Sequence, residues 1–108
     1  MDNFKKAFSQ ELDDKVIYEA YKLVAEFQFY VTDKTQIKTR IYENLNGTFS
    51  YENSHHYQGS SQAGPYISSL ATGHKTIAEA LKQARKELFA YFNKDDKNAR
   101  WIQNESFD

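Results

Sequence analysis

The chain has 108 residues, with 14 Lys and Arg against 15 Asp and Glu, 16% aromatic residues, one proline and no cysteine. A domain of this length buries about two-thirds of the surface that its unfolded chain exposes, so we expect one modest core. The lack of cysteine excludes disulfides and thiolate chemistry, and the net charge of −1 disfavours nucleic acid, whose phosphates require a basic surface.

Targeting signals and membrane spans leave recognisable apolar stretches in a sequence. No apolar run here approaches the ~20 residues that cross a bilayer, and the first residues do not resemble a signal peptide. We therefore expect a cytoplasmic protein with no membrane partner.

Residues 9–31 carry apolar side chains at steps of three and four, which is the period of an amphipathic helix. The stripe consists of Leu12, Val16, Ala20, Leu23, Val24 and Phe27. Its end is open, because Phe27, Phe29 and Val31 also alternate with other residues as an edge strand would. We favour a helix to about Phe29 over a short strand at residues 27–32.

The next segment predicts a β-hairpin. Alternation predicts a strand over residues 36–44, in which one face carries Ile37, Thr39 and Ile41. An Asn-Gly pair follows at residues 46–47, which is a strong hairpin signal, and residues 48–57 supply the returning strand.

The register of this hairpin depends on the length of its loop. A two-residue turn would place the isoleucines and the aromatic residues of the returning strand on opposite faces. We therefore predict a three-residue loop with Gly47 at positive φ, which pairs Asn44 with Thr48 and Ile41 with Tyr51.

Residues 58–65 hold two of the four glycines and the only proline, so they predict a loop. Residues 66–71 then predict a short third strand. A helix is expected to begin at Ile77, because Thr76 and Glu79 have the spacing of a capping box, in which the Glu79 carboxylate accepts from the Thr76 amide. We expect this helix to continue to Phe92.

This order predicts an α+β domain of α-β-β-β-α type, with a three-stranded antiparallel sheet and both helices packed on one face. Asn93 is the expected left-handed terminator of the second helix. We assign residues 1–93 to a single domain and residues 94–108 to a C-terminal tail. Trp101 in this polar tail either packs into the domain, which we favour narrowly, or anchors a partner.

Catalytic and metal chemistry find little support in the sequence. His55 and His56 are adjacent in a predicted strand, so their side chains point to opposite faces and do not chelate one ion together. With His74 they are expected at the surface or partly packed. Ser60 or Ser61 with a histidine would make a small hydrolase, but no G-x-S-x-G elbow occurs. We expect no enzyme, no catalytic residue, no metal and no cofactor.

Tyrosines flank the hairpin and the glycine loop, and tyrosine joins apolar area to a polar tip, as recognition surfaces require. We therefore predict a partner-binding surface formed by Tyr57, Ser60, Ser61, Tyr66, Trp101, Ile102 and Phe107. Lys82, Arg85 and Lys86 alternate along the last helix with Glu79 and Glu87, a pattern typical of a solvated face.

The predicted order, with a glycine just before the last helix, resembles the double-stranded-RNA-binding domain. That family places lysines at the start of the last helix, where they meet phosphates across the minor groove. Here Lys75 is followed by the residues Thr76, Ile77, Ala78 and Glu79, so the side chains that would bind RNA are absent. An RNA- or DNA-binding module of this topology is the alternative function.

Residues 73–92 are similar to the strand-to-helix segment of HicB-type antitoxins. The similarity is carried by Gly73, Thr76, Glu79, Ala80, Leu81, Ala84, Glu87, Leu88 and Tyr91. That family consists of small α/β proteins that bind and neutralise an RNA-cleaving toxin. The resemblance implies a protein-binding role without catalysis.

These observations predict a small non-catalytic binding protein whose partner is another protein. The concrete forms that we expect are an inhibitor, an antitoxin or a phage-type accessory protein, and a homodimer stays open. Nucleic-acid binding is the alternative, and a small hydrolase with a loop serine and a histidine is the third hypothesis.

Overall fold

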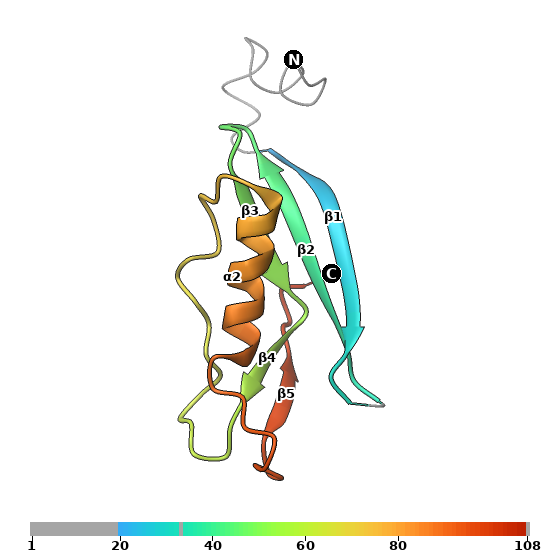
Figure 1. The fold of residues 1–108 in the computed structure, drawn as a ribbon, viewed down its shortest axis with the longest axis vertical. Coiled ribbons are helices and arrows are strands. Elements are labelled where there is room, and N and C mark those ends of the chain that lie inside the picture. Colours follow the sequence, from blue (N-terminus) through green and yellow to red (C-terminus); the bar gives the residue numbers. More distant parts are fainter. Residues whose placement is uncertain (1–19, 33, 108) are drawn as a thin grey trace.

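The computed structural model describes residues 20–32 and 34–107, which form an α+β fold with two small sheets and one helix. A three-stranded antiparallel sheet has the order β1-β2-β3, and a second sheet pairs β4 with β5. Helix α2 lies over the first sheet and leaves β1 uncovered at its outer side (Figure 1). The elements are β1 (Tyr21–Tyr30), β2 (Gln36–Asn44), β3 (Phe49–Asn53), β4 (His55–Gln58), α2 (Ile77–Phe89) and β5 (Arg100–Gln103).

Strand β1 replaces the predicted helix in the described part of residues 9–31, so that prediction is wrong there. Phe27 pairs with Thr39, and Phe29 pairs with Ile37. The alternation of these aromatic residues prevails over the helical spacing, because β2 offers a matching apolar face across the ladder. The predicted helix over residues 9–19 lies outside the described residues.

The predicted register of the hairpin between β2 and β3 is confirmed. Ile41 pairs with Tyr51, and the Asn44 amide donates to the Thr48 carbonyl at 2.8 Å. Gly47 has φ of 85°, a conformation that glycine adopts without the steric cost of a side chain. The loop geometry thus determines which side chains of β3 face the core.

The single returning strand predicted over residues 48–57 is divided into β3 and β4. Ser54 separates them, and its amide donates to the Lys38 carbonyl at 2.8 Å. After this residue the chain leaves the first sheet and pairs instead with β5. The tail therefore contributes a strand that the sequence pattern does not predict.

The predicted third strand over residues 66–71 is wrong, because β1 takes the third place in the sheet. The segment instead runs beside β3, where the Tyr51 amide donates to the Ala71 carbonyl at 2.9 Å. The Ser68 amide donates to the carboxylate of Glu87. The Glu87 side chain of α2 thus accepts a hydrogen bond that a backbone carbonyl of a neighbouring strand would otherwise accept.

Helix α2 begins at Ile77, as predicted from its capping residues. The Glu79 amide donates to the Thr76 hydroxyl at 3.0 Å. The Glu79 carboxylate accepts from the amide of Lys75 at 3.1 Å and not from that of Thr76, which corrects one half of the predicted capping box.

The C-terminal end of α2 differs from the prediction. The helix ends at Phe89, and its cap Ala90 keeps right-handed helical angles. No described residue other than glycine has a positive φ, so Asn93 is not a left-handed terminator. Its amide donates to the Tyr57 hydroxyl at 3.1 Å, which ties the end of the helix to β4.

The core lies between α2 and the strands β2, β3 and β4, against which the helix packs. Its buried hydrophobic residues are Ile37, Ile41, Tyr51, Tyr57, Ala80, Ala84 and Leu88. One stripe of α2 thus fills the centre of the fold. Among the described residues, no helix combines the length and apolarity that a membrane crossing requires.

Candidate protein-interaction site

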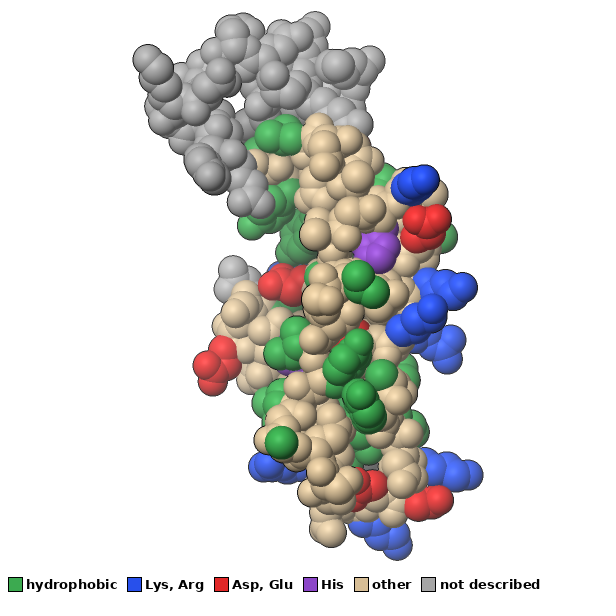
Figure 2. Space-filling view, turned by 90° about the vertical axis from the view of Figure 1, so that its left-hand side faces the viewer, with side chains coloured by type: hydrophobic (Ala, Val, Ile, Leu, Met, Phe, Trp, Pro, Cys, Tyr) green, Lys and Arg blue, Asp and Glu red, His purple; other side chains and the backbone are tan. Residues whose placement is uncertain are grey.

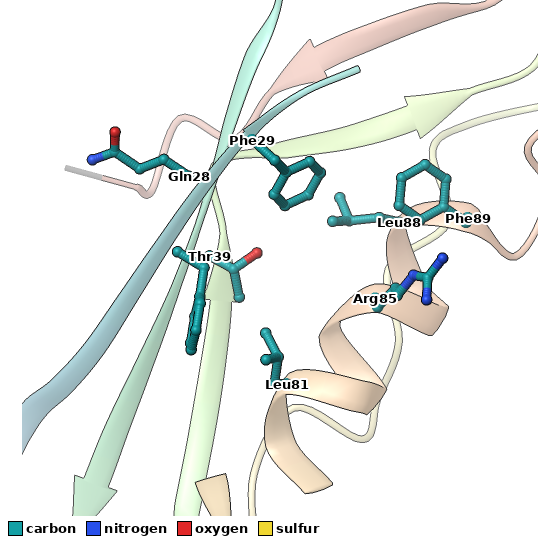
Figure 3. A pocket seen from close by; sticks show the side chains of 8 residues that line it. Gln28, Phe29, Thr39, Leu81, Arg85, Leu88 and Phe89 are labelled. Atoms are coloured by element: carbon teal, nitrogen blue, oxygen red, sulfur yellow. The ribbon is translucent and has the colours of Figure 1, made fainter. Parts of the chain in front are cut away.

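An apolar groove with a volume of about 430 Å³ lies between β1 and α2 (Figure 3). Phe29, Leu81 and Leu88 point into the space between the strand and the helix, whereas Gln28 points away from it. The volume falls in the range of natural binding sites. The lining residues are Phe27, Gln28, Phe29, Thr39, Leu81, Arg85, Leu88 and Phe89.

The groove exists because the sheet is wider than the helix that covers it. Thr39 and its partner Phe27 face α2, yet the helix packs against β2, β3 and β4. It approaches β1 through Phe89, whose ring centroid lies 6.5 Å from that of Phe29. The Phe27 side chain is consequently left 37% exposed.

The backbone of β1 forms the outer edge of the first sheet, and no strand of the described residues pairs with its other side. The Val31 amide donates to the Thr35 carbonyl at 3.1 Å. In an antiparallel ladder such bonded pairs alternate, so the amide and carbonyl of Phe29 point to β2. Those of Gln28 and Tyr30 point outward, where an added strand would pair with them.

A basic rim borders this groove on the helix side. Lys82, Arg85, Lys86 and Phe89 line a second hollow, which shares Arg85 and Phe89 with the groove. The Arg85 guanidinium lies 6.0 Å from the centroid of the Phe89 ring. Within the described part of the chain, none of the three cations forms a salt bridge.

The two acidic residues that alternate with these cations in the sequence do not neutralise them. The Glu79 carboxylate accepts from the Lys75 amide at the start of the helix. Glu87 is only 4% exposed and faces the opposite flank of α2. The three cations are exposed, so this helix face is solvated as predicted, but Glu87 is not part of it, and the cations form a basic rim.

Glu87 is the centre of a buried polar cluster on that opposite flank. Its Oε1 accepts from the Tyr51 hydroxyl and from the Ser68 amide, both at 2.9 Å. Its Oε2 accepts from the Asn53 side-chain amide at 3.2 Å, and Asn53 Oδ1 accepts from Thr39 at 2.6 Å. The carboxylate thus links the helix, β3 and the segment that follows the glycine loop.

The electrostatics of the cluster favour an ionised Glu87. Burial by itself would raise the pKa of Glu87, but the nearby His56 ring and the hydrogen bonds from Ser68, Tyr51 and Asn53 outweigh it and lower that pKa. Burial and the Glu87 charge raise the pKa of Tyr51, which stays a neutral donor. His56 Nδ1 lies 3.6 Å from Glu87 Oε2, too far for a hydrogen bond, and among the described residues this buried atom has no hydrogen-bond partner.

The cluster has the chemistry of a structural network. Both carboxylate oxygens of Glu87 are occupied by protein donors, and buried polar groups are stable only when they are satisfied in this way. Across the described residues, no group of three or more His, Asp or Glu side chains is arranged to hold a metal ion. We therefore assign the cluster to positioning α2 on the sheet.

The predicted site residues Tyr57 and Trp101 lie together in an aromatic cluster. They pair across β4 and β5, with ring centroids 5.1 Å apart. Trp101 also contacts Phe89 at 5.7 Å and Phe92 at 6.3 Å. Trp101 thus packs into the domain, as favoured, and Tyr57 is only 4% exposed, which leaves it no surface for a partner.

Ser60, Ser61 and Tyr66 lie in and after the glycine loop. Both the amide and the hydroxyl of Ser60 donate to Asp96 Oδ2, at 2.8 and 2.9 Å, and these bonds lower the pKa of Asp96. Ser61 is exposed, and the half-buried Tyr66 ring packs edge-on against Tyr91 at 5.3 Å. The Ser60 hydroxyl is therefore engaged with a carboxylate and not with a histidine.

The face that carries this segment also exposes Ile67 and Leu70. Residues 66–72 lie on the left in Figure 1, the side that Figure 2 turns to the viewer. Hydrophobic side chains gather in the middle of this face, and Lys and Arg side chains gather along its right-hand edge. An apolar surface with polar borders is typical of an interaction site.

Ile102 and Phe107 lie apart from the loop residues. Ile102 pairs with His56 between β4 and β5. The Phe107 ring lies 4.1 Å from the Arg40 guanidinium, which belongs to the side of β2 that faces away from α2 because Ile41 faces it. The structure therefore does not join the seven predicted residues into one surface.

The three histidines occupy separate positions. His55 Nδ1 lies 2.7 Å from the Ser54 hydroxyl, and burial lowers the pKa of His55. His56 lies beside Glu87, and His74 Nε2 lies 2.6 Å from the Leu70 carbonyl. Each ring thus has its own local role in packing.

The groove was not predicted from the sequence, because it requires β1 to be a strand. The alternation of Phe27 and Phe29 was the available signal, and the helical spacing of the same segment obscured it. Comparisons with known protein families, with curated proteins and with solved structures give no match to this chain.

Proposed function

We propose that this chain is a non-catalytic protein-binding domain that accepts an extended segment of its partner along the outer edge of β1. The observation that carries the proposal is the position of the apolar groove directly beside the unpaired edge of the sheet. In strand addition, main-chain hydrogen bonds supply affinity, and adjacent pockets for alternate side chains supply specificity. Both parts are present on one side of this molecule.

The other described groups support binding over catalysis. Glu87 is occupied by donors from its own chain, and the Ser60 hydroxyl donates to Asp96. A peptide backbone complements the outward amides and carbonyls of β1, whereas nucleic acid offers no such ladder. Within this class we propose a cytoplasmic inhibitor, antitoxin or accessory protein.

The proposal is tested by removing one outward amide of β1. Gln28→Pro deletes the amide at the outer edge and leaves the ladder to β2 intact, because edge strands tolerate proline there. Gln28→Ala is the matched control, since it removes the same side chain and keeps the amide. Each full-length variant is immobilised and used to capture partners from cells that express the protein.

We expect the native chain and Gln28→Ala to retain the same protein and Gln28→Pro to lose it. Circular dichroism verifies that the proline variant is folded. Equal capture by all three chains would contradict strand addition. Raising the salt from about 50 to 200 mM should weaken capture only modestly, whereas phosphate-driven binding would fall by about 10³-fold or more.

A further inference from the structure

We infer that the segment bound at β1 carries apolar and acidic side chains at every second residue, on the strand face that turns to α2, with its carboxylates directed to Lys82, Arg85 and Lys86. This inference rests on the proposed function and specifies the chemistry of the partner. It follows from the groove floor, from the charges of its rim and from the side chains that a second copy of the chain would bring.

The floor of the groove determines the apolar positions. An added strand lies about 4.8 Å from β1, and its residues opposite Phe27 and Phe29 point to the same face of the sheet. That face carries Leu81, Leu88 and Phe89 on its helix side. Side chains that enter this space lose water, so apolar ones are favoured there.

The rim determines the acidic positions. Lys82, Arg85 and Lys86 have no salt bridge within the described residues, and no carboxylate lines either hollow. Arg85 stands at the junction of the two hollows beside an aromatic ring, where a planar guanidinium binds a carboxylate with two parallel hydrogen bonds. A partner with acidic side chains would neutralise this rim.

A second copy of the chain satisfies these requirements poorly. Pairing of two β1 strands would bring Phe27 and Phe29 of the other copy to the groove side, but no carboxylate. The Glu26 side chain belongs to the opposite face of the sheet, where its Oε1 lies 2.8 Å from the Arg40 guanidinium. Among the described residues, this pairing therefore brings no counter-charge to the three cations.

The inference is tested with a displayed library of random 12-residue peptides, panned on the full-length protein. The same library is panned on the double variant Lys82→Glu, Arg85→Glu. The control carries Lys94→Glu and Lys97→Glu, which make the same change in net charge at exposed positions that line neither hollow.

We expect peptides enriched on the native protein to carry apolar residues and Asp or Glu on one strand face, at every second position. They should bind the Lys82, Arg85 variant at least about tenfold more weakly and the control variant equally well. The reversed variant should itself enrich peptides rich in Lys and Arg. The selected peptides are also tested on Gln28→Pro. This variant should bind none of them, which would locate their binding site at β1.

Several outcomes would overturn the inference. They are enrichment of peptides without acidic residues, undiminished binding by the Lys82, Arg85 variant, displacement of the peptides by a random oligonucleotide pool, and no enrichment at all. So would self-association, detected by sedimentation, that blocks the peptides. If Gln28→Pro abolishes cellular capture and the charge reversal does not, the inference fails while the proposed function stands. If Gln28→Pro leaves capture intact, the proposed function itself fails.

Discussion

The two flanks of α2 differ in whether their charged side chains have partners among the described residues. On the flank toward residues 66–72, the Glu87 carboxylate is buried and receives hydrogen bonds from Tyr51, Asn53 and Ser68. On the flank toward β1, Arg85 borders an apolar groove and has no counter-charge among the described residues. One flank is complete within the chain, and the other has the composition of an unfilled interface.

This difference teaches where the stability and where the binding capacity of the domain reside. A satisfied buried carboxylate holds the helix, the sheet and a loop segment in one arrangement. An uncovered flank contributes little to folding, because its side chains are solvated in the free protein. Substitutions on the two flanks should therefore separate stability from binding.

The largest loss of stability is expected on removal of the C-terminal tail. Truncation after Asn93 removes β5 and Trp101, whose ring contacts Tyr57, Phe89 and Phe92. We expect the free energy of unfolding to fall by about 4 kcal/mol, since losing a packed tryptophan costs about that much. Urea denaturation of the truncated and full chains measures it.

Trp101→Phe is the matched control for the truncation, because it keeps β5 and part of the ring contact. It should cost less than the truncation. Tryptophan fluorescence of the full chain should be blue-shifted and remain so on dilution. An unchanged melting temperature after truncation would show that the tail does not stabilise the domain.

The next largest effect is expected at Glu87. Glu87→Ala leaves the donors of Tyr51, Asn53 and Ser68 buried without an acceptor. We expect a loss of about 3 kcal/mol in the free energy of unfolding, because unsatisfied buried donors carry their full desolvation cost. Glu79→Ala, on an exposed residue of the same helix, is the control, and an equal cost for both would contradict the special role of Glu87.

Acidification tests the same flank. The pKa of Glu87 is lowered in the folded state, so its ionised form stabilises the protein at pH values above the pKa of an unfolded glutamate. This stabilisation is lost as the pH falls through the lowered pKa of the folded state. Urea unfolding between about pH 6 and pH 2 should therefore show a smaller loss for Glu87→Gln than for the native chain, and parallel curves would contradict the prediction.

The structure also shows which features the sequence could predict. The loop at Gly47 and the start of α2 at Ile77 were predictable, because each depends on a few adjacent residues with strong conformational preferences. Residues 21–30 were not, since they carry both a helical and a strand period. Only the apolar face of β2, supplied from elsewhere in the chain, selects between the two.

The candidate site was harder to predict because it depends on relative placement. In the sequence, Glu87 belongs to a mixed charged helix face. In the structure, it accepts hydrogen bonds from Ser68 and Asn53. The sequence predicts Tyr57 as a recognition residue, whereas in the structure β5 covers it. The roles of these two residues thus depend on long-range contacts, which the composition of the chain does not reveal.

The smallest effect on stability is expected at Arg85, on the uncovered flank. Its side chain forms no salt bridge within the described residues and contacts its own helix through the Phe89 ring at 6.0 Å. Arg85→Ala should change the free energy of unfolding by less than about 0.5 kcal/mol, as is usual for exposed positions, while it weakens binding of acidic peptides. A cost comparable with that of Glu87→Ala would mean that this flank is already covered in the free protein, and the contrast between the two flanks would then disappear.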